Sequence, residues 1–156
     1  MLQAIQSGTP VQLWQALVQE TYARTGHPLD ESSESYLVFV LLRYQTDTLL
    51  LSRTQGMDWM DALSLAGTAR SDALRDVGDR CLLLAGLFPG YAERSRVSVD
   101  YFITLGRSAY QGVADAARQA YAALYAQLAH SYRELVETLD TMRRLSKASE
   151  VVKTIR

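Results

Sequence analysis

Leu37-Val38-Phe39-Val40-Leu41-Leu42 is the longest unbroken apolar run in this chain of 156 residues. A group of acids and capping residues, Asp30-Glu31-Ser32-Ser33-Glu34, precedes it. Such residues favour the N-terminus of a helix, because its unpaired N–H groups and its dipole attract side-chain oxygens and negative charge. A helix that is apolar on nearly every side must be surrounded by other elements. The run therefore predicts a buried central helix over residues 33–45.

A second central helix is predicted over residues 69–87. Leu74, Val77 and Cys81 fall on one helical stripe, and residues 82–88 are apolar all round. Pro89 and the glycine after it end this helix, since proline cannot continue it.

Helical periodicity and boundary residues organise the rest of the chain. Thr9-Pro10 and Ser98 are predicted helix starts, Asp58 is predicted to cap a short helix, and Gly26 is a predicted helix end. The further helices expected are 10–25, 58–66, 98–113 and 114–146, the last as one long helix or as two that meet near residues 130–131. Only residues 48–52 have any strand character. The prediction is all-α: a compact bundle of six or seven helices, with a single domain over residues 1–146 and a frayed tail over 147–156.

Composition places few constraints on function. The net charge of −1 gives no electrostatic reason to expect nucleic acid or an anionic membrane as a partner. Cys81 is the single cysteine, so no disulfide framework or cysteine-based zinc site is available. The first residues lack the pattern of a signal peptide, and no apolar run approaches the roughly 20 residues of a membrane span. We expect a cytoplasmic protein that is not inserted in a membrane.

Three carboxylates, Asp72, Asp76 and Asp79, share one helical face and are the candidate metal ligands. Arg75 and Arg80 are interleaved with them, which favours a surface of four-residue ion pairs instead. A di-iron site needs Glu-x-x-His motifs, which this chain lacks. We therefore predict no metal and no other cofactor.

No catalytic arrangement stands out. Neighbouring residues on a helix point about 100° apart, so His130 and Ser131 do not form a nucleophile–base pair. Cys81 lies on an apolar stripe, which indicates a packed thiol rather than a nucleophile. A helix-turn-helix over residues 59–78 would present acids to phosphates and is disfavoured. The expected protein is not an enzyme.

An apolar and aromatic stripe on the last helical segment is the candidate interface, formed by Tyr121, Tyr125, Leu128, Tyr132 and Leu135. Two interpretations remain open. One face of an amphipathic helix docks on the core with its hydroxyls at the rim, or the stripe binds a partner helix or a second copy of the chain.

A small-molecule pocket is the other candidate site. Polar groups near glycines or helix starts would converge on an apolar cavity if the central helices and the 98–113 helix pack together. These are Tyr36, Asp79, Asp100, Tyr101 and Tyr110. Equally, Asp100 is an acid in the first turn of its helix, where the dipole stabilises it.

Several segments resemble a family of small, uncharacterised proteobacterial proteins. They are Tyr36-Leu37-Val38, Asp76-Val77-Gly78-Asp79, Leu84-Ala85-Gly86-Leu87-Phe88-Pro89 and Val99-Asp100-Tyr101-Phe102, with Leu105-Gly106 and Ala109-Tyr110. The resemblance covers roughly residues 36–113. It implies a bacterial protein whose distinctive residues lie in the middle of the chain, and it implies no reaction, cofactor or partner.

The function expected from the sequence is a non-enzymatic interaction or regulatory module. It would bind either a protein partner or further copies of itself, forming a homo-oligomer through the C-terminal helix. The alternative is a binder of an apolar or amphiphilic small molecule in the helical core.

Overall fold

The computed structural model describes residues 9–47, 50 and 54–146. These residues form eight helices and no strand, which confirms the predicted all-α bundle. The helices are α2 (Pro10–Thr25), α3 (Glu31–Tyr44), α4 (Gln55–Leu63), α5 (Gly67–Leu87), α6 (Pro89–Arg94), α7 (Val99–Ala116), α8 (Gln119–His130) and α9 (Tyr132–Ser146). The predicted tail over 147–156 lies outside the described residues, as does 48–52 apart from Leu50.

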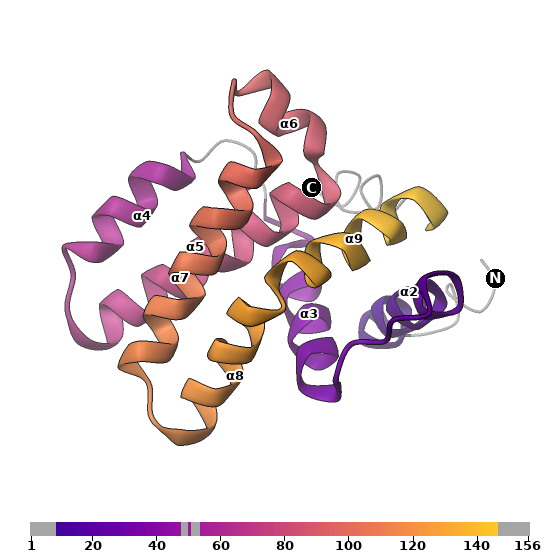
Figure 1. The fold of residues 1–156 in the computed structure, drawn as a ribbon, viewed down its shortest axis with the longest axis horizontal. Helices are drawn as coiled ribbons and strands as arrows, with labels where there is room; N and C mark the ends of the chain where they lie inside the picture. The colour runs from indigo at the N-terminus through magenta and orange to yellow at the C-terminus, as the bar shows by residue number, and fades with distance from the viewer. Residues whose placement is uncertain (1–8, 48–49, 51–53, 147–156) are drawn as a thin grey trace.

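The centre of the fold is α5. Every residue from Val77 to Leu87 is buried, as the continuous apolar pattern of that segment predicts. Figure 1 shows α5 and α7 side by side through the middle of the molecule, with α4 at one edge and α2 at the other. Because α9 and α6 also pack against α5, nearly all of its second half is enclosed.

The first predicted central helix, α3, is less enclosed than its sequence indicates. It packs against α2 and α8 and buries Leu37, Val40 and Leu41. Phe39, in the middle of the apolar run, is 48% exposed. It lies on the same helical face as Ser35 and Glu31, four and eight residues earlier, and this face points outward. The prediction that α3 is surrounded on all sides is therefore wrong for this face.

Helix boundaries follow capping chemistry. Thr9 and Gln12 form a capping box at the start of α2, and the Ser98 hydroxyl accepts a hydrogen bond of 2.9 Å from the backbone N–H of Tyr101. These two predicted starts are confirmed. The prediction that Asp58 caps the start of this helix is wrong, because α4 begins at Gln55, with Thr54 as its N-cap residue. The Asp58 carboxylate pairs with the guanidinium of Arg80.

The bundle contains more helices than the six or seven predicted. Pro89 ends α5 but also occupies the first position of α6, where its missing N–H costs nothing. Residues 114–146 are not a single helix: α7 ends at Ala116, and the chain between α8 and α9 breaks at Ser131. The alternative with two helices meeting at His130-Ser131 is the correct one.

The buried apolar residues of all these helices belong to one contiguous core. None of the helices in the described ranges combines the length and apolar character that a membrane span requires.

Candidate functional site

The most unusual group in the core is Asp79, a carboxylate with no exposed surface. It projects from α5 between α3 and α7. The hydroxyls of Tyr36 and Tyr110 both donate to its Oδ1, at 2.7 and 2.6 Å. Its Oδ2 accepts no hydrogen bond from the described residues and faces Arg43, whose Nη1 is 3.7 Å away.

Tyrosines from four helices surround this carboxylate. We call Asp79, Tyr36, Tyr110, Tyr125 and Tyr132 the Asp79 cluster. The Tyr110 ring packs against the rings of Tyr36, Tyr125 and Tyr132 at centroid distances of 5.4–5.8 Å, in edge-to-face geometry. Tyr125 donates to the Tyr36 hydroxyl at 3.3 Å, and Tyr132 donates to the backbone oxygen of Gly78 at 2.7 Å. The cluster therefore ties α3, α7, α8 and α9 to α5.

Burial dominates the electrostatics of the cluster. It raises the pKa of Asp79 to about 6, against the opposing effect of the two tyrosine hydrogen bonds and Arg43. Burial also raises the pKa of the Tyr36 and Tyr110 hydroxyls, which Asp79 raises further. Both hydroxyls are therefore protonated donors at neutral pH. Its hydrogen bonds and ring contacts join residues of five helices, so the cluster fixes how these helices pack.

The predicted pocket residues do not converge on one site. Tyr36, Asp79 and Tyr110 come together in the Asp79 cluster, where Asp79 and Tyr110 are fully buried in the core. Tyr36 also borders an open hollow of about 550 Å³ between α3 and α8, which none of the other predicted pocket residues lines. Asp100 lies at the surface and pairs with Arg133 at 3.3 Å. Tyr101 is also exposed, at the start of α7.

The predicted interface residues are mostly part of the core. Tyr125, Leu128, Tyr132 and Leu135 are buried within the chain itself. Only Tyr121 is free at the surface, with 69% exposure. The interpretation in which the stripe docks on the core is correct for these four residues, so they do not form an exposed contact surface.

The acidic ladder is a set of ion pairs, as predicted, although its partners differ from those expected. Arg75 pairs with Asp72 and Asp76, and Asp76 also pairs with Arg43 at 3.0 Å. The four-residue pairs of Arg75 with Asp79 and of Asp76 with Arg80 are absent from the described residues, because Asp79 and Arg80 point into the core. Within the same ranges, no group of His, Cys, Asp or Glu is suited to a metal ion.

The environment of Cys81 is apolar. The thiol is fully buried, and burial raises its pKa. A protonated, enclosed thiol is a packed core group, in agreement with the prediction from the sequence.

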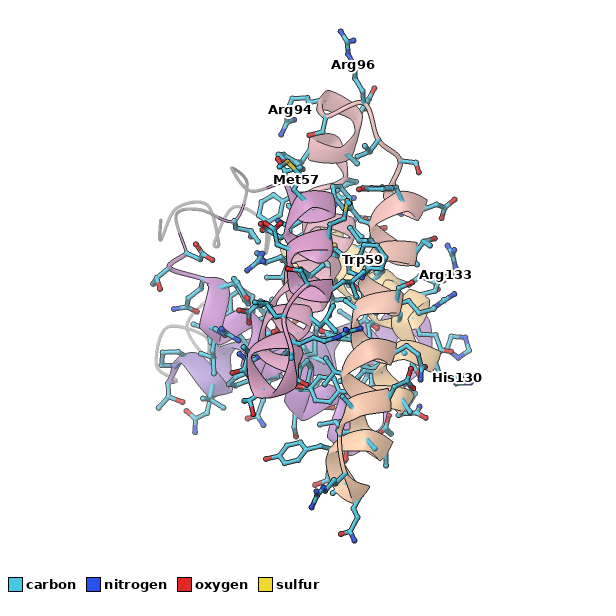
Figure 2. All side chains as sticks on the ribbon, turned by 90° about the vertical axis from the view of Figure 1, so that its left-hand side faces the viewer. Met57, Trp59, Arg94, Arg96, His130 and Arg133 are labelled. Atoms are coloured by element: carbon cyan, nitrogen blue, oxygen red, sulfur yellow. The ribbon has the colours of Figure 1, made fainter. Side chains whose placement is uncertain are left out.

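An unexpected surface occurs on α4, which packs against α5 partly through polar groups. The guanidinium of Arg80 donates to Gln55 Oε1 at 3.0 Å and to Asp58 Oδ2 at 3.3 Å. On the outside of the helix, Met57 and Met60 are 65% and 66% exposed, and Leu63 is also exposed. These three residues share one stripe at three-residue spacing, which we call the α4 face. Figure 2 shows Met57 at one end of α4 and Trp59 between α4 and α7.

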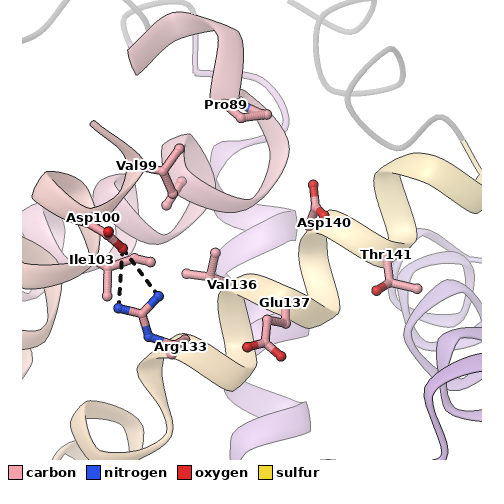
Figure 3. Close-up of a pocket in the computed structure, with 10 residues that line it drawn as sticks. Pro89, Val99, Asp100, Ile103, Arg133, Val136, Glu137, Asp140 and Thr141 are labelled. Atoms are coloured by element: carbon pink, nitrogen blue, oxygen red, sulfur yellow. Dashed lines mark hydrogen bonds and ion pairs between the residues drawn. The ribbon is translucent and has the colours of Figure 1, made fainter. Parts of the chain in front are cut away.

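A hollow of about 420 Å³ lies on another side of the molecule, between α5, α7 and α9 (Figure 3). Its base is apolar, and its rim carries charged side chains from α7 and α9. Asp100 is the only member of the predicted pocket that lines this hollow.

Comparisons with models of known protein families, with curated proteins and with solved structures give no significant match. The resemblance of residues 36–113 to proteobacterial proteins stays a prediction.

Sequence reasoning missed Arg43 as a neighbour of Asp79, and it missed the α4 face. The first omission has no simple signal, since the two residues are far apart in the chain. The α4 face did have a signal in the sequence. The apolar residues of this short helix cover too much of its circumference to be buried together; they are Met57, Trp59, Met60, Ala62 and Leu63.

Proposed function

We propose that this protein is an interaction module that self-associates through the α4 face. The observation that carries the proposal is the orientation of α4. Its polar Gln55 and Asp58 turn toward Arg80 of α5, whereas Met57 and Met60 turn outward. Trp59 and Ala62 also face inward, so the inner side of α4 is partly polar while its most exposed side is apolar. In the usual arrangement of a surface helix, the large apolar side chains face the core.

The composition of the α4 face suits a second copy of the chain. Large exposed apolar residues are concentrated here, because four of the nine in the described part of the chain fall between Met57 and Leu65. Methionine side chains adapt to one another, and the three residues of the stripe carry no charge. Asp61, which is exposed and one turn after Met57, borders the stripe. A two-fold dimer uses the same patch on both subunits, and it is the commonest symmetric assembly of soluble proteins.

The proposal retains the self-association expected from the sequence and changes its location. The C-terminal stripe supplies only Tyr121 as a surface contact, since its other four members are buried. The α4 face lies instead on a helix whose inner side is fixed by hydrogen bonds to Arg80.

Two charge substitutions distinguish these locations. Met60 and Tyr121 are 66% and 69% exposed, so Met60→Asp and Tyr121→Asp should both leave the fold intact. We expect a dimer for the wild-type chain and for Tyr121→Asp by native mass spectrometry and light scattering. Met60→Asp should weaken the dimer at least a hundredfold, because an unpaired carboxylate would be buried in an apolar contact, at a cost of about 3 kcal/mol or more.

Circular dichroism of both variants verifies that helicity is retained. Loss of the dimer in Tyr121→Asp alone would place the interface at the start of α8 instead. A wild-type chain that stays monomeric at every concentration tested would refute self-association.

A further inference from the structure

The hollow between α5, α7 and α9 has the size of a small-molecule site. Its volume of about 420 Å³ lies within the roughly 300–1,000 Å³ typical of ligand pockets. Five apolar residues from four segments form its base: Ala85, Pro89, Val99, Ile103 and Val136. Figure 3 shows Val136 and Ile103 in the middle of this base, with Val99 and Pro89 on one side and α9 on the other.

The rim of the hollow is acidic. Asp100, Glu137 and Asp140 contribute three carboxylates, against the single guanidinium of Arg133. Arg133 is already engaged, since both of its terminal nitrogens lie 3.3 Å from Asp100 Oδ1. This pair connects α7 to α9 at one end of the hollow.

The two remaining acids differ in their neighbours. Asp140 pairs with Arg143 at 2.6 Å and with Arg144 at 2.8 Å. Glu137 has no ion pair or hydrogen bond with any described residue. Among the carboxylates on the rim, it is the one without an ion pair in the part of the chain that the structure describes.

We propose that this hollow binds a small amphiphilic amine, with its apolar chain on Ile103 and Val136 and its ammonium group beside Glu137. Burial of the chain supplies the main driving force, and the carboxylate selects the cationic head over a neutral one. The volume accommodates a chain of several carbons but not a helix of a partner protein, whose diameter with side chains is about 10 Å. The site is on a different part of the molecule from the α4 face and does not depend on self-association.

Octylammonium and 1-octanol form a matched pair of probes, since they have the same apolar chain and differ in head-group charge. Calorimetric titration of the full chain should give binding of octylammonium that is about three- to tenfold tighter than that of 1-octanol. Glu137→Gln should remove this preference and leave the binding of 1-octanol unchanged.

Glu134→Gln is the control. Glu134 lies one turn earlier on α9 and lines only a neighbouring hollow of about 370 Å³, which Glu137 also borders. The preference for octylammonium should persist in this variant. Thr141→Trp, at the rim of the proposed site, should weaken both probes by filling it.

Equal affinity for the two probes in the wild-type chain, or no binding of either, would overturn the proposal. A larger effect of Glu134→Gln than of Glu137→Gln would move the site to the neighbouring hollow and also overturn it. Binding of a lysine-containing peptide without binding of octylammonium would identify a protein partner instead and reject the small-molecule proposal.

Discussion

The Asp79 cluster and the α4 face depart from the usual distribution of residues in opposite directions. The Asp79 cluster contains a carboxylate that is fully buried, and the α4 face contains methionines that are mostly exposed to solvent. In the cluster, two tyrosine hydroxyls compensate the buried oxygen Oδ1. On the α4 face, no described part of the chain covers Met57 or Met60.

The two regions differ in whether the monomer itself supplies their interaction partners. A buried polar group is costly unless it is hydrogen-bonded, and the cluster supplies partners from several helices, so it stabilises a particular packing of the monomer. Exposed apolar groups contribute no stabilising free energy until they are removed from water, so the α4 face contributes only when an assembly covers it. The first region should therefore respond to substitution in stability, and the second in association.

Gly78→Ala should have the largest effect on the stability of the cluster. A methyl group at this position would overlap the ring of Tyr110, which is fully buried and cannot move away without breaking its bond to Asp79. We expect a loss of about 3 kcal/mol or more in the free energy of unfolding, measured by urea denaturation.

Gly112→Ala is the matched control in α7, because its methyl group would meet only one terminal methyl group of the buried Leu74, which makes no hydrogen bond. This variant should lose at most about 1 kcal/mol, since a small shift of that methyl group relieves the contact and alanine is the better helix former. Equal losses in the two variants would mean that the cluster has no special rigidity.

The pH dependence of stability isolates Asp79 itself. Burial raises its pKa to about 6 in the folded state, from an unfolded value of 3.8, so the folded state binds the proton more tightly. The resulting stabilisation is complete below the unfolded pKa and is lost as the pH rises through about 6. Between about pH 4 and pH 7.5 the loss should be roughly 2 kcal/mol.

Asp79→Asn removes this titration and retains a side chain of similar size. The difference in unfolding free energy between the wild type and this variant should therefore decrease with rising pH over that interval. Carboxylates far from Asp79 contribute equally to both chains and cancel. A difference that does not change with pH would show that Asp79 ionises as easily in the folded state as in the unfolded one, and a difference that increases would show that it ionises more easily in the folded state.

Sequence periodicity identified the helices well because local patterns determine them. The apolar run of α5 and the caps at Thr9 and Ser98 each depend on residues within a few positions. The break at Ser131 stayed open as an alternative, since no proline or glycine marks it. The exposure of Phe39 was missed because periodicity shows that a face is apolar without showing whether a neighbour covers it.

The candidate sites were harder to predict, since they depend on contacts between distant segments. Tyr36, Asp79 and Tyr110 were correctly selected together as polar groups near the central helices, but the pattern could not show that their hydroxyls and carboxylate satisfy one another. Tyr125 and Tyr132 were assigned to an interface because a tyrosine at the core and a tyrosine at a contact surface have the same helical spacing.

The smallest expected effect on stability is that of Met60→Gln. Met60 is exposed and Ala62, two residues later on the same helix, is fully buried, so the two positions compare the outer and inner sides of α4 directly. In urea denaturation at low protein concentration, Met60→Gln should change the unfolding free energy by less than about 0.5 kcal/mol. Ala62→Gln should cost about 2 kcal/mol or more, because it forces a larger polar group into packed surroundings. If Met60→Gln were as costly as Ala62→Gln, the α4 face would be packed within the monomer, and no surface would remain there for a second copy.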